Sequence, residues 1–557
     1  MEDENFMKAV LVDGYIDEPA AFGVSPYISP KIRLLAGILF RAGYEVEYHT
    51  IDDVRKKELW EAFRGHQILV VHGGITTPGR YVGGNPVTLN DIKKLLSGNK
   101  EPQKIICGPI ALGYSLKGGT KAMNVELSEV DALLSHELQL ADFLGLELKG
   151  SRYEILNELY PIGVRIVPQH PRYPDVMIEF DISSGCERSD GYCSFCTESL
   201  LYGKFESRDL RGIERELRAL KDVGVKALRF GRSANVVAYG YNRDVGKPDP
   251  EAVENLFRLA TEILKPEVLH IDNGNPIFIA QYPEESRKIL ETIARYDTPG
   301  DIISFGVESF DETVRRLNNL GGSAEDILKA IEIVNEIGAF RVDGVPKLLP
   351  GINLLYGLPG HSKETFKIDR AYLKKIYDND WLIRRLNIRQ VMIFEGTPLS
   401  HQVLPKFSKK AFIKHKETIR KEFDTPMLKK VFPVGAILRK VIPEYTQGDI
   451  TFGRPLGTYP ILVGSPVKFE SPTDMVVIGH GIRSITAIPV NADLNTLSLR
   501  ELTFLPGIGK NRATMLVLNR PFKNWEELVN LLEQETVNNL KKLRLQIGGK
   551  TDCLKSR

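Results

Sequence analysis

Short apolar runs alternate with amphipathic helical stretches over residues 7 to about 148. The runs are MKAVLV, KIRLLAGILFRAGYEVEYH, HQILVVHGG, DIKKLLSG and KIICGPIAL. Strand and helix in this rhythm predict a doubly wound parallel sheet. We therefore expect an α/β domain at residues 1–150. The proline-rich connector VPQHPRYPDV at residues 167–176 follows it, because each proline disfavours helix in the residue before it.

From Val176 to about Leu399 the alternation resumes with longer periods. Helical segments such as IERELRALKDVG and AEDILKAIEIVNEIG separate the apolar runs. Six strands, each followed by a helix, predict a partial (β/α)6 parallel barrel over residues 170–400. A second open α/β sheet is the alternative that the pattern leaves open. The six strand candidates are VMIEFDI, VKALRFG, EVLHID, DIISFGVES, INLLYGL and IRQVMIF.

Two further segments complete the chain. Residues 401–490 begin with a lysine-rich helical pattern and then change to Gly, Pro and β-branched residues, which predicts a basic helical segment and a small β module. The basic run is typical of a solvated helix face, and phosphate binding is its alternative. Residues 497–557 are helical and polar, with eleven Lys and Arg against six Asp and Glu. Basicity is therefore local to the C-terminal segment.

Length and composition indicate a multidomain globular protein. At about 150 residues per domain, 557 residues predict roughly three to four domains. The 74 Lys and Arg against 72 Asp and Glu leave a net charge of +2, so any nucleic-acid surface has to be local. No apolar run approaches the roughly 20 residues of a membrane span, and the start MEDENFMKAV is unlike a signal peptide. We therefore expect a cytoplasmic protein.

The cysteines indicate a metal centre. Five cysteines are too few for a disulfide framework, and Cys186, Cys193 and Cys196 lie within eleven residues, just after an apolar strand. Three thiolates on one loop can hold three irons of a cubane cluster and leave the fourth iron open for chemistry. A zinc site with a remote ligand such as His170, or plain core packing, is the alternative, because zinc sites share the CxxC spacing.

The sequence around these cysteines resembles the radical S-adenosylmethionine enzymes. The run from Cys193 to Cys196 is similar to the second half of their cysteine motif, with an aromatic residue before the last cysteine. The similarity continues through SFGVESFDETV, INLLYGLPGHSKETF and MIFEGTPL, and so covers residues 176 to 400. It points to the branch that contains the tRNA methylthiotransferases. Several independent motifs in one order make the resemblance highly specific.

The resemblance implies cofactors and the residues that contact them. The three cysteines would bind a [4Fe-4S] cluster, S-adenosylmethionine would chelate its open iron, and reductive cleavage would yield a 5′-deoxyadenosyl radical. An electron donor such as ferredoxin or flavodoxin is implied as a partner. For the polar contact residues, ordinary loop capping is the alternative. The implied contacts are Phe195 beside adenine, Gly231, Arg232 and Ser233 near the methionine amino group, and Glu308, Ser309, Asp272 and Asn273 near ribose or methionine.

Three features depart from the superfamily's pattern. Six residues separate Cys186 from Cys193, where the common spacing is three. The Gly-Gly-Glu segment, at residues 231–233 here, lacks its glutamate, and Asn319 stands where the fourth helix usually carries an arginine. The extra loop ERSDGY is expected to bulge without moving the cluster ligands.

Residues 1–150 resemble the cobalamin-binding-like domain that is often fused to radical enzymes. The stretch VDGYIDEPAAFG beside Asp13 lacks the Asp-x-His-x-x-Gly ligand motif, so cobalamin held by a protein histidine is not expected. The histidines of this region are interpreted as surface or capping residues. They are His49, His66, His72 and His136.

The C-terminal run from Leu505 to Lys510 resembles the helix-hairpin-helix motif. Gly507 and Gly509 would let the hairpin turn tightly and aim backbone N–H groups at a phosphate. Together with Lys510 and Arg512 they form the candidate nucleic-acid site. Such contacts position a nucleic-acid backbone without reading its sequence. Protein contact or simple packing is the alternative.

These features predict a radical enzyme that acts on a nucleic acid, with tRNA favoured. An endonuclease-III-type DNA glycosylase shares the C-x6-C-x2-C spacing, but Tyr202 stands where its fourth cysteine is due and the hairpin follows the cluster instead of preceding it. A nucleic-acid-binding iron–sulfur protein without radical turnover is the other alternative. Before Cys186 the chain offers Cys107 alone, and Cys553 is interpreted as a core or exposed thiol. The cysteines thus allow one cluster and disfavour two-cluster methylthiolation.

Overall fold

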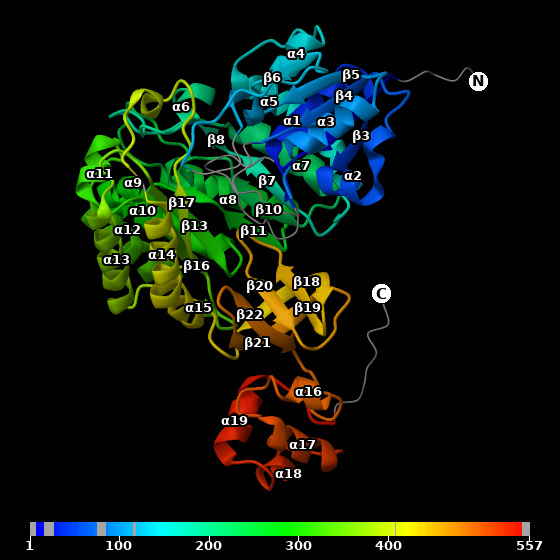
Figure 1. The fold of residues 1–557 in the computed structure, drawn as a ribbon, viewed down its shortest axis with the longest axis vertical. Coiled ribbons are helices and arrows are strands. Elements are labelled where there is room, and N and C mark those ends of the chain that lie inside the picture. Colours follow the sequence, from blue (N-terminus) through cyan, green and yellow to red (C-terminus); the bar gives the residue numbers. More distant parts are fainter. Residues whose placement is uncertain (1–6, 16–26, 75–84, 115–118, 407, 549–557) are drawn as a thin grey trace.

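The computed structural model describes residues 7–15, 27–74, 85–114, 119–406 and 408–548. Cys553 and most of the VDGYIDEPAAFG stretch lie outside the described residues. Among the residues described, no helix is both long and apolar enough to cross a membrane. Figure 1 shows the chain passing from an N-terminal sheet to a larger barrel, then to a small barrel and a helical tip.

The N-terminal sheet has five parallel strands in the order β3-β1-β4-β5-β6. This is the doubly wound arrangement expected from the alternating runs. One face packs against α1 and α5 and the other against α2 and α3, so both faces are buried. The strands are β1 (Met7–Asp13), β3 (Tyr44–Thr50), β4 (Ile68–His72), β5 (Gln103–Cys107) and β6 (Ala132–Leu134), and the helices are α1 (Pro30–Arg41), α2 (Ile51–Lys57), α3 (Leu89–Gly98), α4 (Gln139–Phe143) and α5 (Arg152–Gly163).

The larger barrel contains the six expected strands, all parallel, which confirms the predicted α/β class. One sheet runs β11-β10-β7-β2 and the next runs β12-β13-β16-β17. Only Asp272 lies between β11 and β12, so the two sheets follow one another around the barrel. The strands are β7 (Met177–Asp181), β10 (Ala227–Gly231), β11 (Val268–Ile271), β12 (Asn273–Gly274), β13 (Asp301–Glu308), β16 (Leu348–Tyr356) and β17 (Arg385–Gln390).

Polar caps set where the surrounding helices begin. The Ser323 side chain accepts the Asp326 N–H while the Asp326 carboxylate accepts the Ser323 N–H, a reciprocal capping box. The apolar faces of these helices then bury against the strands in one continuous core. The helices are α7 (Leu210–Asp222), α8 (Pro250–Leu264), α9 (Pro276–Gln281), α10 (Pro283–Tyr296), α11 (Glu312–Leu317), α12 (Ala324–Gly338) and α13 (Lys363–Asp378).

The N-terminal sheet and the larger barrel are joined more closely than the sequence suggests. The short strand β2 (Tyr27–Ile28) pairs with β7, so the N-terminal segment supplies an edge strand of the barrel. Arg33 of α1 donates to Glu216 of α7 at 2.7 Å, and both side chains are fully buried. Division of the chain near residue 150 stays a prediction, because a single apolar core runs through both parts.

The basic segment packs as amphipathic helices on the larger barrel. It comprises α14 (Lys409–Ile419), a π-helical turn η6 (Arg420–Asp424) and α15 (Thr425–Val431). Phe412, Phe423 and Met427 point into the barrel core, and most of the lysines lie outside. The lysine run therefore forms one face of a docked helix, as the solvated-face interpretation expects.

The small β module is a closed five-stranded barrel with the order β18-β19-β20-β22-β21. All neighbours are antiparallel except β20 and β22, which run parallel. This order and this parallel pair are the connectivity of the OB-fold. The sequence predicted only a small β module. The strands are β18 (Ile437–Gln447), β19 (Ile450–Pro455), β20 (Leu462–Ser465), β21 (Thr473–His480) and β22 (Ser484–Pro489).

Four short helices form the tip of the molecule. They share an apolar core with the outer side of β21 and β22, through Val476, Ile478 and Ile488. The small barrel and the helices therefore form one packed unit, which we call the C-terminal unit (residues 437–548). Its helices are α16 (Leu499–Leu502), α17 (Lys510–Leu518), α18 (Trp525–Val529) and α19 (Gln534–Lys542).

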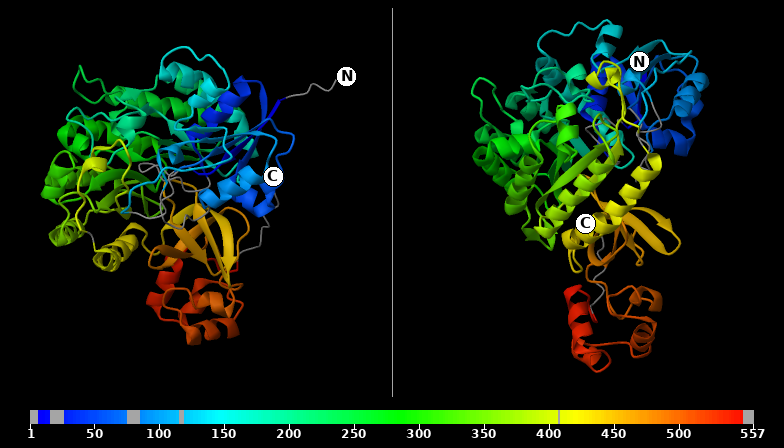
Figure 2. Two further views of the ribbon diagram at one scale, coloured as in Figure 1. Left: turned by 45° about the horizontal axis from the view of Figure 1, so that its top comes forward. Right: turned by 60° about the vertical axis from the view of Figure 1, so that its left-hand side comes forward.

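The C-terminal unit closes one end of the larger barrel. Lys440 pairs with Glu267, which precedes β11, and Arg384, which precedes β17, donates to the Tyr459 carbonyl at 3.2 Å. These partners mark the amino ends of the barrel strands. The cysteine loop belongs to the opposite end, near α6 (Glu198–Leu201) and β8 (Ser183–Ser184), as Figures 1 and 2 show.

Candidate radical site

The three cysteines lie on one loop at the carboxyl end of β7. β8 follows β7 directly and pairs with β9 (Glu206–Ser207), and a bridge joins Cys186 to Lys204. The Cys196 N–H donates to the Cys193 carbonyl at 3.1 Å, so these two cysteines share one tight turn. The loop therefore returns to the sheet on both sides of the cysteines.

The CxxC turn is fixed to the far side of the barrel mouth. The Ser194 hydroxyl donates to the Asn318 side chain at 2.8 Å, and the Ser194 N–H donates to the Asn318 carbonyl. The Leu399 N–H donates to the Ser194 carbonyl at 2.8 Å. Contacts to α11 and to the segment after β17 thus hold the cysteine turn over the strand ends.

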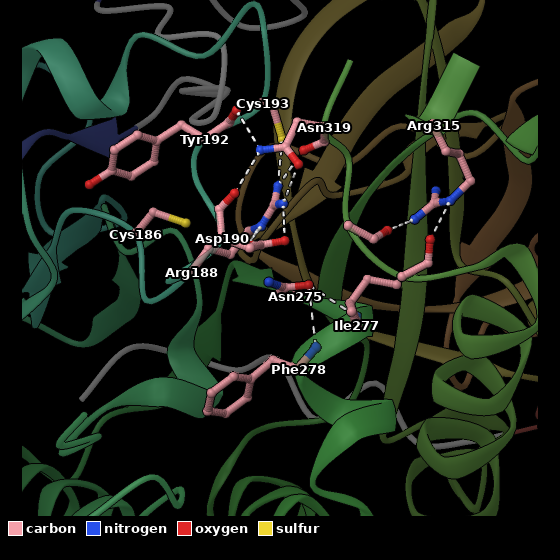
Figure 3. Close-up of polar contacts among 12 residues, drawn as sticks. Cys186, Arg188, Asp190, Tyr192, Cys193, Asn275, Ile277, Phe278, Arg315 and Asn319 are labelled. Carbon is pink, nitrogen blue, oxygen red and sulfur yellow. Dashed lines mark hydrogen bonds and ion pairs between the residues drawn. The ribbon is translucent and has the colours of Figure 1, made fainter. Parts of the chain in front are cut away.

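Two of the three departures from the superfamily's pattern contact each other, as Figure 3 shows. The Asn319 amide donates to the carbonyls of Asp190 and Tyr192, at 3.2 Å each, in the extra loop. Arg188 of that loop donates to the Asn319 carbonyl at 2.6 Å and forms an ion pair with Asp190 at 2.8 Å. The longer loop and the asparagine therefore form one clamp.

The clamp also reaches a cluster ligand. The Arg188 guanidinium lies 3.4 Å from the Cys193 sulfur. Burial raises the pKa of Cys193, and the Arg188 charge opposes that rise. Burial likewise raises the pKa of Cys196 to about 12 and that of Cys186 well above its usual range. A thiol that coordinates a metal ion is deprotonated, so a bound cluster would reverse this effect of burial.

Gly231, Arg232 and Ser233 follow β10 at the same edge, as the resemblance implies. A β-carbon on Gly231 would lie 2.4 Å from a Glu179 carboxylate oxygen, so glycine is required there. The Ser233 hydroxyl bonds to the Ser183 hydroxyl at 2.5 Å. The Asn273 amide donates to the Ser233 carbonyl at 3.3 Å, which brings that residue into the same group.

Arg232 turns toward the cysteine loop. It has a left-handed backbone, with φ of 56°, and its guanidinium lies 3.4 Å from the Glu198 carboxylate. It also lies 4.1 Å from the centre of the Tyr202 ring. Glu198, which follows Cys196 by two residues, accepts the Gly185 N–H at 3.1 Å. The buried Glu198 carboxylate thus contacts the segment 231–233, in which the family's glutamate is absent.

Glu308 ends β13 beside the cysteines, and its charge contributes to the raised pKa of Cys193. Burial raises the pKa of Glu308 itself to about 7, although Arg389 and Arg315 pull it down. Arg315 donates to the carbonyls of Val307 and Ser309, at 3.1 and 2.9 Å, and so fixes the end of β13. This buried arginine lies four residues before Asn319.

Ser309 and Asp272 have protein partners. The Ser309 hydroxyl donates to Asp369 at 3.3 Å and accepts the Asp311 N–H at the start of α11, which is the capping alternative. Asp272 is fully buried and accepts the Tyr459 hydroxyl at 2.9 Å. Burial raises the pKa of Asp272 to about 6. The described contacts tie Ser309 to the larger barrel and Asp272 to the C-terminal unit, and their cofactor roles stay predictions.

Phe195 packs as an apolar residue at the barrel mouth. It lies against the cluster formed by Val314, Leu358, Val391 and Leu399. It is partly buried and sits between the two cysteines of the CxxC turn. Its contact with adenine stays a prediction. An aromatic ring at the barrel mouth is consistent with that contact.

Sequence reasoning missed a second buried carboxylate next to the cluster ligands. Glu187 is 4 % exposed, and its carboxylate accepts from the Asn235 amide at 2.9 Å and from the Asn275 amide at 2.8 Å. Asn275 also caps α9 by accepting from Ile277 and Phe278 (Figure 3). The available signal was the ERSDGY insertion itself, because it contains both Glu187 and Arg188.

His170 is not a partner of the cysteine loop. It lies within the connector beside the Tyr48 ring of β3, with ring centres 6.2 Å apart. Its Nδ1 accepts the Arg172 N–H at 3.0 Å. The structure therefore gives no support to a zinc site that unites His170 with the three cysteines.

The C-terminal hairpin has the expected local geometry. Gly507 has φ of 79°, and Gly509 precedes α17 with open space where a β-carbon would lie. Lys510 is exposed at the first position of α17. Arg512 instead donates to the Gly507 carbonyl at 2.8 Å and pairs with Glu533 at 2.9 Å. Arg512 therefore braces the hairpin, and its contact with nucleic acid stays a prediction.

One expectation about the histidines is wrong. His72 is fully buried at the end of β4, and is neither a surface nor a capping residue. His49 and His66 pair with Glu47 near the surface, and His136 is exposed. A lone histidine after an apolar run gave no signal of burial, because the partners of His72 come from other strands.

Comparison with known proteins agrees with this site. The sequence profile of the radical SAM superfamily matches residues 181–372. An uncharacterized protein of Methanocaldococcus jannaschii is 40% identical, over 86% of this chain and 92% of its own. The ribosomal protein uS12 methylthiotransferase RimO of Clostridioides difficile is 24% identical, over 47% of this chain and 54% of its own. The tRNA-2-methylthio-N(6)-dimethylallyladenosine synthase of Buchnera aphidicola is 27% identical, over 35% and 41%.

The fold, the cysteine loop and the profile match define the class of protein. The chain belongs to the radical SAM superfamily of enzymes, and within it to the family of the Methanocaldococcus protein. Its cofactors are a [4Fe-4S] cluster and S-adenosylmethionine. Together they supply a 5′-deoxyadenosyl radical when the cluster is reduced. The donor set fits, because three thiols share one loop at the barrel mouth. The glycosylase alternative is left without support.

Proposed function

We propose that this radical enzyme modifies a structured RNA in the cytoplasm, with tRNA as the favoured substrate. The observation that supports the proposal is the C-terminal unit, in which an OB-type barrel shares one core with a helical tip whose sequence resembles a helix-hairpin-helix. Both modules are used for nucleic-acid binding in other proteins. Fold alone does not fix function, so the argument rests on what their surfaces carry.

The small barrel carries an aromatic pair on its outer surface. Tyr445 of β18 and Phe452 of β19 are cross-strand partners, with ring centres 5.0 Å apart and planes 17° apart. Tyr445 is 44 % exposed. Aromatic faces on this type of barrel stack against nucleic-acid bases, at about 1–3 kcal/mol per base. The pair therefore supports binding of unpaired bases.

The tip and the barrel are oriented by a direct contact. Arg500 of α16 pairs with Asp449 in the turn between β18 and β19. This turn is one of the loops with which OB-folds contact nucleic acid. The hairpin N–H groups at Gly509 and the exposed Lys510 complete a surface on which a phosphate backbone can be positioned.

The location of the C-terminal unit favours a large substrate. It closes the amino ends of the barrel strands, whereas the cysteine loop lies at their carboxyl ends (Figure 1). A substrate held at both places has to extend around the barrel. A folded RNA meets that requirement, and a small metabolite does not.

The relatives leave a protein substrate as the second candidate. One acts on a ribosomal protein and another on a tRNA nucleoside, as their names state. The aromatic pair and the hairpin favour the RNA. The reaction is one that needs no second cluster, such as carbon insertion, rearrangement or methylation, because Cys107 is the only cysteine before Cys186.

The direct test compares tRNA nucleosides by mass spectrometry in a strain that lacks the gene. We expect one nucleoside to be missing, to return with the wild-type gene, and not to return with Cys186→Ala. Unchanged tRNA nucleosides together with a mass change of a ribosomal protein would establish the protein substrate instead.

The binding surface is tested separately with the full-length protein and tRNA. Tyr445→Ala should weaken binding about 5- to 100-fold, by the stacking energy given above. Lys221→Glu, on the exposed side of α7, is the charge-matched control for Lys510→Glu. Equal affinity of Tyr445→Ala, Lys510→Glu and the wild type would remove the C-terminal unit from the proposal.

A further inference from the structure

Four strands of the N-terminal sheet end in residues that carry chemistry. β1 ends at Asp13, β4 at His72 and β5 at Cys107, and Glu137 follows β6 by three residues. Asp13 is level with His72, and His72 is level with Cys107, in the strand registers. The carboxyl edge of a doubly wound sheet is where such folds bind ligands.

Three of these residues meet in space. One ring nitrogen of His72, the Cys107 sulfur and a Glu137 carboxylate oxygen all lie within 4.8 Å of one another. His72 and Cys107 are fully buried, and Glu137 is 5 % exposed. The His72 Nε2 lies 3.0 Å from the Glu137 carboxylate. Among the described residues, the other ring nitrogen has no hydrogen-bond partner, which is costly for a buried polar atom.

Glycines leave space around this group. A β-carbon on Gly108 would lie 2.8 Å from the His72 Nε2, and Gly108 has φ of 111°. One on Gly73 would contact Ile110 at 3.3 Å. Gly108, which follows Cys107, therefore adds no side chain to the space beside the His72 ring.

The charges around the group match a cation. Burial alone would raise the pKa of Glu137, but Lys31 and His72 hold it well below its usual range, so this carboxylate is ionised. Lys31 lies 3.6 Å from it as a competing cation, and Asp13 is a further buried carboxyl near His72. Burial and the Glu137 charge raise the pKa of Cys107, and a bound metal ion would reverse that effect.

We propose that His72, Cys107 and Glu137 bind one divalent transition-metal ion of the Zn²⁺ type. Imidazole, thiolate and carboxylate are the three ligand types of zinc, and sites with three protein ligands keep the fourth position for water or substrate. The site is separate from the [4Fe-4S] ligands and shares no residue with them. It accounts for the one cysteine of the N-terminal sheet without a second iron–sulfur cluster.

The site faces the radical barrel. After β5 the chain runs to the end of β17, where the Gly119 N–H donates to the Val391 carbonyl at 2.7 Å and the Ala122 N–H to the Ile393 carbonyl at 2.9 Å. Lys31, beside Glu137, lies 5.7 Å from the centre of the Tyr202 ring, which Arg232 also contacts. The residues around the group are therefore connected to the strand ends of the barrel and to the segment that follows the cysteine loop.

The test uses the full chain with Cys186, Cys193 and Cys196 all changed to Ala, so that no cluster forms and only Cys107 and Cys553 remain as thiols. The protein is expressed with added Zn²⁺ or Co²⁺, desalted, and analysed for metal by mass spectrometry. We expect about one metal ion per chain, and for Co²⁺ a near-ultraviolet thiolate charge-transfer band.

Three further changes in this background assign the ligands. Cys107→Ser and Glu137→Gln, which preserve size, should each lower the metal content at least tenfold, and the first should abolish the band. Cys553→Ser should leave both unchanged. Circular dichroism identifies any variant that fails to fold. The metal content of the parent and of the remaining variants then decides whether the site exists. Less than a tenth of a metal ion in the parent, or a band that depends on Cys553, would overturn the proposal.

Discussion

The cysteine loop and the carboxyl edge of the N-terminal sheet place their chemistry in opposite ways. The loop carries the three predicted cluster ligands within eleven consecutive residues, and its shape is held by a clamp to Asn319. The sheet edge collects Asp13, His72, Cys107 and Glu137 from four strand ends far apart in sequence. The first arrangement is visible as a motif, whereas the second exists only once the strands are in register.

The two regions also differ in the direction in which the pKa of a buried carboxyl is shifted. Around the barrel, burial outweighs the nearby positive charges and raises the pKa of carboxyls such as Asp272 and Glu308. At the sheet edge, Lys31 and His72 hold the pKa of Glu137 low. The net effect of burial and nearby charge on the pKa of a carboxyl is therefore opposite in the two regions.

The largest expected effect is loss of the cluster, which should follow from changes in the cysteine loop and not from a change at the sheet edge. Changing Cys186, Cys193 or Cys196 singly to Ala should remove the [4Fe-4S] cluster and reduce 5′-deoxyadenosine formation to background, because three thiolates are required. Cys107→Ser should leave about four irons per chain in anaerobically reconstituted protein. Iron analysis and the visible spectrum check this, and iron near eight would restore two-cluster methylthiolation.

The clamp is expected to matter next. Arg188→Ala should slow 5′-deoxyadenosine formation about 10- to 100-fold, since a hydrogen bond from a charged group contributes about 1.5–3 kcal/mol. Asn319→Ala removes the other half of the same contact, so the double variant should be little worse than either single one. The initial rate with excess dithionite measures this. Additive losses would show that the two residues act separately.

The opposite pKa shifts of Asp272 and Glu137 predict opposite pH effects on thermal unfolding. The raised pKa of Asp272 means that its stabilising effect is fully present below about pH 4 and is lost as the pH rises through about 6. Asp272→Asn should therefore gain stability over the wild type between pH 4 and 7, by at most about 3 kcal/mol. Glu137→Gln, in metal-free protein, should lose stability at pH 7, and the difference should shrink as the pH falls below about 4.5.

Melting temperatures from circular dichroism at four pH values between 4 and 8 measure both effects. Asp369→Asn, at another buried carboxyl whose pKa burial raises to about 7, is the matched comparison for Asp272→Asn. Parallel curves for Asp272→Asn and Glu137→Gln would contradict the contrast between the two regions.

The smallest effect concerns the hairpin. Lys510→Ala should reduce the dependence of tRNA affinity on salt by less than one unit of log–log slope, the contribution of a single phosphate contact. Arg512→Ala should instead lower the melting temperature, because its guanidinium is engaged by Gly507 and Glu533. Affinities at four salt concentrations measure the slope. An equal loss of slope in both variants would place Arg512 at the phosphate as well.

Much of the fold follows from patterns that lie within short windows of sequence. Three strands of the N-terminal sheet, β1, β4 and β5, and the six barrel strands are contiguous apolar runs, so these were predicted. β3 lies at the end of a helix-like run and β6 has three residues, and neither was predicted as a separate strand. β2 has only two residues and shows no period, and closure of the small barrel depends on β18 pairing with β21 and β20 with β22. Pairings between distant strands leave no local signal.

The same limit applies to the sites. The cysteines were predicted as cluster ligands because they are neighbours, and Gly231 to Ser233 as cofactor contacts because of their place at the end of a strand. Both assignments stay predictions. The contacts of Glu187 and Arg188 could not be predicted from the insertion, because their partners Asn275 and Asn319 are 88 and 131 residues away. His72 was misassigned for the same reason, because its partner Glu137 is 65 residues away.

The central claim is that the cysteine loop supports radical chemistry with one cluster. Its most direct test is the amount of 5′-deoxyadenosine formed from S-adenosylmethionine by reduced, reconstituted protein that carries about four irons per chain. We predict several equivalents per chain over an hour for the wild type and none for Cys193→Ala. Protein with a full cluster that forms no 5′-deoxyadenosine, with or without tRNA, would contradict the account.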